Sequence, residues 1–127
     1  MALARAHVAA SPYASRIEIR GQDVTQLDER AAYTVVWLAA PFLERPVAEA
    51  ALDRLAVSLA PKGYLVVGLY AMPTDEAGAA ITALRVVRSG GHLWDTVEVE
   101  QQLRARGFHD VETCVNPPTC FVMGRRP

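Results

Sequence analysis

Histidine and cysteine are the residues of this sequence whose side chains could do acid–base or nucleophilic chemistry at neutral pH. The chain has three histidines and two cysteines. His92 follows a pair of glycines in a predicted flexible turn, and its imidazole can accept a proton from a hydroxyl group. His7 lies in a predicted helix and His109 lies beside an aspartate, and both have the character of surface residues. His92 is therefore the candidate for a catalytic base.

The two cysteines, Cys114 and Cys120, do not form a metal or redox motif. They lack the CxxC spacing, and two cysteines are too few for a disulfide scaffold. Either they face each other across a hairpin that turns at Pro117 and Pro118, or they are reduced packing residues, which is the favoured interpretation. The sequence also shows no Ser-His-Asp arrangement, no metal-ligand spacing and no G-x-G turn. We therefore expect no metal site and no phosphate-binding loop.

The composition predicts a single globular domain, residues 1–127. Hydrophobic residues make up 51% of the chain and charged residues 21%, which excludes collagen-like, mucin-like and disordered proteins. The formal charge is −1 and the arginines are scattered, so no positive field exists to hold a nucleic-acid backbone. No apolar stretch approaches the roughly 20 residues that cross a bilayer, and Arg5 and His7 interrupt any secretory signal. We expect a soluble, cytoplasmic protein that binds neither nucleic acid nor membrane.

Strand-like and helix-like segments alternate along the first half of the chain, which predicts an α/β layer fold. After an alanine-rich helix, the RIEIR segment at residues 16–20 has the alternation of a strand with one exposed face. The apolar run YTVVWL at residues 33–38 is typical of a strand buried on both faces in the middle of a parallel sheet. A helix from Pro46 to Pro61 and a strand at residues 64–70 complete a strand-helix-strand unit with a right-handed connection.

A second helix is predicted to begin near Thr74, with acidic residues at its positive end and arginines at its negative end. Ile81 and Leu84 are the residues that we expect on its core-facing side. Gly90 and Gly91 break the helix.

A third helix and a hairpin complete the predicted elements. Asp95 and Glu98 have the spacing of a capping box, and Gly107 has the position of a left-handed helix terminator. The strands at residues 110–115 and 119–124 are joined by a turn too short for a crossover, so they should be antiparallel.

Four segments in this order resemble the carboxyl-terminal part of class I S-adenosylmethionine-dependent methyltransferases. They are the strand YTVVWLAAPFL, the helix end and strand APKGYLVVGLY, the turn RSGGHLW, and LRARGFHDVET ahead of the final hairpin. The resemblance covers nearly the whole chain. It implies an α/β, truncated Rossmann-like methyltransferase fold, with a parallel sheet and a terminal antiparallel β-hairpin. In that family the strand order is 3-2-1-4-5-7-6, and RIEIR and YTVVWL match strands three and four.

The resemblance also implies which residues bind the cofactor, S-adenosylmethionine. Asp23 matches the acidic residue that accepts a hydrogen bond from the adenine amino group, and Val24 would supply the next backbone amide. The alternative role of Asp23 is to cap the turn that follows it. Trp37, Leu38 and Ala39 match the fourth-strand motif beside the sulfonium, although a large aromatic residue in a central strand is as often a core residue.

The residues after the fourth strand match the methyl acceptor site of the family. Pro41 and Phe42 would line its entrance, and His92 lies where the site would open. This stretch lacks the acidic and amide residues that grip a nitrogen, which disfavours a nucleic-acid base as acceptor. The implied reaction is methyl transfer to a small molecule, in which the protein chiefly aligns donor and acceptor.

The first two strands of the family, with their glycine-rich turn and ribose-binding acid, have no counterpart in this sequence. Since those strands lie between strands three and four, RIEIR either pairs directly with YTVVWL or lies loosely, leaving YTVVWL as an exposed apolar edge. A homodimer or a partner chain would cover such an edge. Two functional hypotheses follow: a methyltransferase that is incomplete in this chain, and an inactive methyltransferase-like module that acts through protein–protein contacts.

Overall fold

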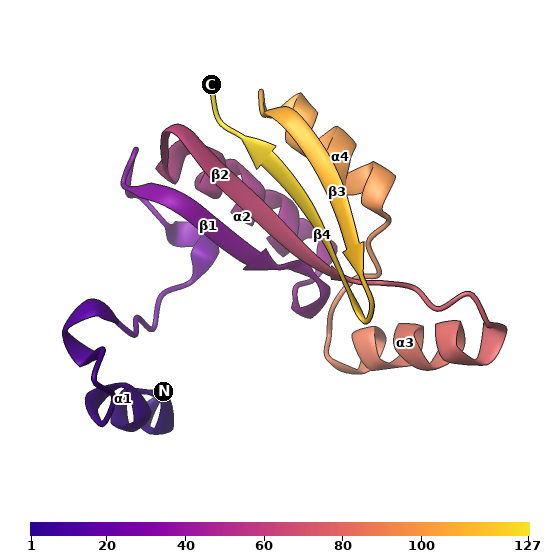
Figure 1. Ribbon diagram of the computed structural model, residues 1–127, viewed down its shortest axis with the longest axis horizontal. Coiled ribbons are helices and arrows are strands. Elements are labelled where there is room, and N and C mark those ends of the chain that lie inside the picture. The colour runs from indigo at the N-terminus through magenta and orange to yellow at the C-terminus, as the bar shows by residue number, and fades with distance from the viewer.

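The computed structural model describes residues 1–127 and has four strands in one sheet, in the order β1-β2-β4-β3. The strands are β1 (Tyr33–Ala39), β2 (Leu59–Tyr70), β3 (His109–Asn116) and β4 (Thr119–Arg125). The helices are α1 (Ala2–Ala9), α2 (Arg45–Ser58), α3 (Glu76–Arg88) and α4 (Thr96–Ala105), with short 3-10 helices η1 (Ala14–Arg16), η2 (Val24–Gln26) and η3 (Ala40–Phe42). Figure 1 shows α2 and α4 behind the sheet, α3 beyond one end of it, and α1 apart from it. No helix is long and apolar enough to span a lipid bilayer.

β1, α2 and β2 form the predicted strand-helix-strand unit. The two strands are parallel, with Trp37 opposite Val66. Pro46 lies in the first turn of α2, where its missing N–H costs no helical hydrogen bond. The prediction that this helix runs to Pro61 is wrong, because α2 ends at Ser58 and the chain is already extended at the next residue. Proline disfavours helical backbone in the residue before it, so the stop comes early.

β3 and β4 form the predicted antiparallel hairpin, and β4 lies between β2 and β3. The register places Cys114 opposite Phe121, and Cys120 opposite Val115. Because Cys120 and Phe121 are adjacent on β4, the two cysteines point to opposite faces of the sheet. Cys120 is buried, Cys114 is exposed, and both are free thiols. The favoured interpretation of reduced packing residues is confirmed for Cys120, while Cys114 is reduced but does not pack in the core.

The hydrophobic core lies between the sheet and the pair of helices α2 and α4. Its members from the sheet and these helices are Leu38, Ala48, Ala51, Leu52, Leu55, Leu59, Leu65, Val67, Leu69, Val99, Leu103, Cys120 and Val122. α3 contributes little, since Val86 is its one buried residue. The prediction that Ile81 and Leu84 face the core is wrong, because both are exposed. α3 extends past the end of the sheet, so no layer lies against that side of it (Figure 1).

An aspartate caps the first turn of both α3 and α4, and of these two caps only the one on α4 was predicted. Asp75 and Asp95 each accept a hydrogen bond from a first-turn backbone N–H, at 2.7 Å and 2.8 Å. Gly107 follows α4 with a φ of 83°, the left-handed conformation expected there. Glu98 does not complete a capping box, because its carboxylate pairs with Arg45 of α2.

β1 is an edge strand, and the prediction of a place in the middle of the sheet is wrong. β2 pairs with one side of β1, and no strand pairs with the other. Val35 and Trp37 are 61% and 63% exposed on the face of the sheet that carries no helix. RIEIR does not form the predicted strand, since residues 17–23 have no strand pairing. Of the two arrangements that the sequence left open, the exposed apolar edge is the one observed.

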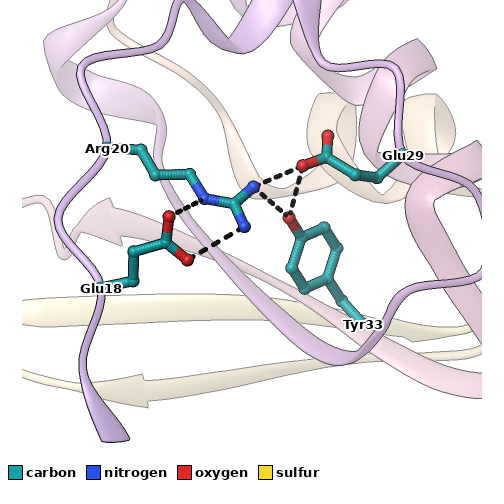
Figure 2. A network of polar contacts seen from close by, with 4 residues as sticks. All are labelled: Glu18, Arg20, Glu29 and Tyr33. Atoms are coloured by element: carbon teal, nitrogen blue, oxygen red, sulfur yellow. Dashed lines mark hydrogen bonds and ion pairs between the residues drawn. The ribbon is translucent and has the colours of Figure 1, made fainter. Parts of the chain in front are cut away.

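Residues 10–32, here called the arm, contact the start of β1 through a polar network around Arg20. Figure 2 shows Arg20 between the carboxylates of Glu18 and Glu29, with the hydroxyl of Tyr33 beside it. Arg20 Nε lies 2.9 Å from Glu18 Oε1, and the Tyr33 hydroxyl donates to Glu29 Oε1 at 3.3 Å. This network keeps the arm near the first residue of β1 without joining the sheet.

Candidate functional site

The carboxyl ends of the parallel strands meet the turn that carries the RSGGH residues. Gly91 packs on the chain after β1, where a Cβ atom on Gly91 would lie 1.7 Å from the Pro41 carbonyl oxygen. The backbone N–H of His92 donates to the Leu43 carbonyl at 3.1 Å. Gly90 turns the chain with a φ of 76°, a conformation that costs glycine little. The two glycines thus hold His92 against the end of β1.

Aromatic rings gather at this end of the sheet. The ring centres of Phe42 and Tyr70 are 6.3 Å apart, with an angle of 73° between the planes. Those of His92 and Trp94 are 4.9 Å apart at 85°, so both pairs are edge-to-face. Pro41 and His92 line one small hollow together. The structure therefore brings together the three residues that were predicted to bind the acceptor, Pro41, Phe42 and His92.

A cavity of about 820 Å³ opens next to this aromatic group, between the start of α3 and the turn of the β3–β4 hairpin. Tyr70 belongs to the aromatic group and also lines the cavity. The cavity wall further includes Met72, Ile81, Thr82 and Arg85. None of these residues was predicted from the sequence to belong to a site. The position of these residues after a predicted parallel strand could have indicated the cavity. Ligands of parallel sheets bind beyond the carboxyl ends of the strands, and this cavity follows the end of β2.

Asp23 caps the 3-10 helix η2. Its Oδ1 accepts hydrogen bonds from the Thr25 backbone N–H at 2.9 Å and from the Thr25 hydroxyl at 2.8 Å. These bonds, the backbone bond first, lower the pKa of the Asp23 carboxyl below its usual range. Both bonds fall on one oxygen, which leaves Oδ2 to accept from another donor. The turn-capping role of Asp23 is therefore observed, and it uses only one of the two carboxylate oxygens.

The three site residues predicted on β1 have different surroundings. Leu38 is buried in the core, so only its backbone is open to a ligand. Trp37 points to the opposite face, where its indole covers Gly68 so closely that a Cβ on that glycine would lie 2.9 Å from Nε1. Ala39, the last residue of the strand, is half-buried. Trp37 is thus an exposed residue of the sheet and does not pack in the core.

A groove of about 360 Å³ separates the arm from β1. Its walls include Arg20, Gln22 and Val24 from the arm and Tyr33, Val35 and Val36 from the strand. Val24 is the predicted cofactor residue that faces this groove, and Asp23 precedes it in the chain. The three predicted residues on β1 lie outside the groove walls. The five predicted cofactor residues therefore do not enclose one pocket in this chain.

Solved structures with the same arrangement of elements include several methyltransferases. The apo form of the S-adenosylmethionine-dependent methyltransferase SibL matches 99% of this chain with a TM-score of 0.79 and 22% identity. PigF with SAH matches 99% with a TM-score of 0.78 and 18% identity. An O-methyltransferase family protein from Burkholderia thailandensis matches 97% with a TM-score of 0.76 and 19% identity. No protein-family model and no curated protein matches the sequence.

This chain therefore has the fold of S-adenosylmethionine-dependent methyltransferases, and the resemblance stated from the sequence is confirmed for the fold. More narrowly, it corresponds to one portion of that fold, because it spans about 40% of the length of each of these three chains. The portion consists of the parallel pair β1 and β2 and the antiparallel hairpin whose second strand lies beside β2.

Proposed function

We propose that this chain is part of an S-adenosylmethionine-dependent methyltransferase that modifies an oxygen of a small-molecule acceptor. The observation that carries the proposal is the match of 99% of the chain to SibL at a TM-score of 0.79. The match to an O-methyltransferase family protein at a TM-score of 0.76 supports oxygen as the methylated atom. The comparisons do not favour the alternative of an inactive module. A cytoplasmic location, without nucleic-acid or membrane partners, stays part of the proposal on the sequence evidence given above.

The residues at η2 fit the adenine end of the proposed cofactor. Asp23 Oδ2 is an ionised acceptor whose partner oxygen is already bonded to Thr25, and an exocyclic amino group is a matching donor. Val24 begins η2, where the first N–H groups of a helix have no partner within the helix. When bound, the cofactor supplies an already activated methyl group. The sequence holds no G-x-G turn for its methionine end, so those contacts have to come from other residues.

His92 is the proposed base for the acceptor hydroxyl. The backbone of His92 is fixed by its bond to Leu43, and its ring is oriented edge-to-face against Trp94. Phe42 and Tyr70 provide the aromatic surface on which a planar acceptor would lie. In this arrangement a ring nitrogen of His92 takes the hydroxyl proton as the acceptor oxygen becomes nucleophilic, and it later releases that proton to water.

Completion of the cofactor site by further polypeptide is part of the proposal. The chain spans about 40% of the matched methyltransferases, and β1 has an open side next to the groove that Val24 lines. We propose that a partner chain or a second copy covers this open side. Bound in that way, it would bring cofactor contacts that this chain lacks.

Calorimetry with S-adenosylhomocysteine tests the cofactor assignment. We expect weak, saturable heat from the purified chain, and we expect Asp23→Asn to reduce the affinity about tenfold, since an ionic hydrogen bond is lost. Asp28→Asn is the matched control, because Asp28 is an exposed aspartate of the same arm and should leave the affinity unchanged. Absence of heat up to millimolar ligand would refute cofactor binding by this chain and leave its fold unaffected.

A further inference from the structure

One side of α3 forms a wall of the cavity that follows β2. Four residues of the helix line this cavity, namely Gly78, Ile81, Thr82 and Arg85. Their spacing of three and four residues places them on the same side of α3. Ile81 and Arg85 are exposed because this side of the helix faces the cavity and not the core. The exposed residues of this side are therefore available to a ligand.

The two charged residues of the cavity wall, Asp75 and Arg85, are separated along α3. The Asp75 carboxylate caps the helix, where it accepts a hydrogen bond from the Gly78 N–H at 2.7 Å. Arg85 lies in the last turn of α3, about 15 Å from Asp75 at the rise of an α-helix. Arg85 takes part in none of the ion pairs of the structure. One end of the cavity therefore carries a positive charge that no carboxylate neutralises.

The positively charged end of the cavity lies beside the proposed acceptor site. Figure 1 shows that the chain runs outward after β2 and returns to the end of the sheet along α3. Val86, the residue after Arg85, lines the hollow that contains His92 and accepts a hydrogen bond from the Gly91 N–H at 3.1 Å. Tyr70 lines both this hollow and the cavity. A ligand that lies against Tyr70 therefore has His92 on one side and Arg85 on the other.

We propose that the methyl acceptor is an aromatic hydroxy acid whose carboxylate binds Arg85, an inference that rests on the proposed methyl transfer and adds the class of its substrate. A guanidinium group binds a planar carboxylate through two parallel hydrogen bonds. Thr82, on the same side of α3, adds a hydroxyl donor to this end of the cavity. The aromatic ring of the acceptor lies against Tyr70, and its hydroxyl group faces His92. The cavity of about 820 Å³ has the size of pockets that enclose small organic ligands.

Two matched probes test the acid group without cofactor. The probes are para-hydroxycinnamate and its methyl ester, which share the ring and the hydroxyl group and differ in the negative charge. In an NMR titration of the purified chain, we expect the acid to bind about tenfold more tightly than the ester. The shift changes should include the amides of Tyr70 and of the cavity side of α3, and the preference should shrink at high salt because the ion pair is screened. Equal affinities, a preference that salt does not change, or shift changes elsewhere would overturn the proposal.

Matched arginine variants of α3 locate the charge that binds the acid. Arg85→Gln should weaken binding of the acid about tenfold and change binding of the ester by less than about twofold, and Arg85→Lys should restore part of the loss. Arg88→Gln is the control, because Arg88 is exposed in the same last turn and lies outside the cavity wall. Both arginines are exposed, so we expect both variants to fold. Equal losses in Arg85→Gln and Arg88→Gln would contradict the proposal.

The cofactor titration separates this inference from the proposed function. Arg85→Gln should leave the affinity for S-adenosylhomocysteine unchanged, because Asp23 and Arg85 line different cavities. Binding of S-adenosylhomocysteine without a preference for the acid would refute the substrate class and leave the proposed methyl transfer in place. A preference for the acid that depends on Arg85, without binding of S-adenosylhomocysteine, would support the acid site and refute cofactor binding by this chain.

Discussion

Gly91 lies so close to Pro41 that no side chain fits between them. A Cβ atom on Gly91 would be 1.7 Å from the Pro41 carbonyl oxygen and 2.6 Å from the carbonyl carbon. Both atoms belong to the backbone, which cannot rotate out of the way as a side chain could. The contact joins the turn before His92 to the end of β1, so it sets the relative positions of the residues proposed to bind the acceptor.

Gly91→Ala should destabilise the protein more than the same change at the preceding residue. We expect Gly91→Ala to lower the free energy of unfolding by about 3 kcal/mol, because the added methyl group forces the backbone apart. Gly90→Ala should cost about 1 kcal/mol, since Gly90 has a positive φ but nothing within 4 Å of an added Cβ. Urea denaturation of the two variants measures the difference. Equal losses would show that the Gly91 contact is not close in solution.

Arg106 should contribute more to stability than the more exposed Arg104. Arg106 Nε pairs with Asp53 of α2 at 2.7 Å, and its other nitrogens donate to the carbonyls of Glu49 at 3.2 Å and Gln102 at 3.1 Å. Its side chain is 16% exposed, against 53% for Arg104. Arg106→Met should lower the free energy of unfolding by about 2 kcal/mol, and Arg104→Met by less than about 0.5 kcal/mol. Thermal or urea denaturation that gives the reverse order would contradict this ranking.

Glu100 should make the stability depend on pH on the acid side. Its carboxylate accepts hydrogen bonds from the Thr113 hydroxyl at 2.6 Å and from Arg104 at 2.9 Å. The Thr113 bond first, and then Arg104, lower the pKa of Glu100 from its ordinary value of 4.5. A carboxyl whose pKa is lower in the folded state stabilises that state above the unfolded pKa, and this stabilisation is lost as the pH falls through the folded pKa.

The free energy of unfolding should therefore decline between about pH 5 and pH 3, and Glu100→Gln should make that decline shallower. Glu112→Gln is the control, since Glu112 is an exposed glutamate of β3 and is not bonded to Thr113 or Arg104. Urea denaturation at a series of pH values gives the slopes. A Glu100→Gln variant with the slope of the unaltered protein would contradict the assigned role.

The two cysteines should differ in their reactivity toward a thiol reagent. Cys114 is exposed on β3, so it should react at once in the folded protein. Cys120 is 2% exposed, and burial first, then the nearby Cys114, raises the pKa of its thiol, which lowers the thiolate fraction. Its reaction should follow the rate of unfolding. Immediate reaction of two thiols per chain, or of none, would contradict the register of the hairpin.

Local sequence patterns were enough to predict the elements that cover the core, because the signals lie within each element. Pro46 marked the start of α2, Asp95 marked the cap of α4, and the short turn forced an antiparallel hairpin. The place of YTVVWL in the sheet was not predictable from the strand itself. An apolar run has the same appearance whether a neighbour covers it or not, and here β1 has one neighbouring strand.

The candidate site was predicted only in part, because local sequence patterns do not show how distant elements are placed relative to one another. Pro41, Phe42 and His92 lie close together because the glycines bring a distant turn to the end of β1. The resemblance to the family predicted this, because it places the three residues at one acceptor site. The cavity beside Tyr70 depends on how α3 stands relative to the hairpin, and no local pattern specifies that placement. Ile81 was assigned to the core from its helical spacing, which cannot show that α3 extends beyond the sheet.

The exposed indole of Trp37 and the enclosed indole of Trp94 give the protein two optical reporters with separate meanings. Trp37 lies over Gly68 on the open face of the sheet, so its emission and its quenching by acrylamide respond to whatever covers that face. Trp94 is shielded inside the domain, and its emission responds to loss of the packed interior. Covering of the open face and global unfolding can therefore be followed in one sample by their different spectra, without attaching a label to the chain.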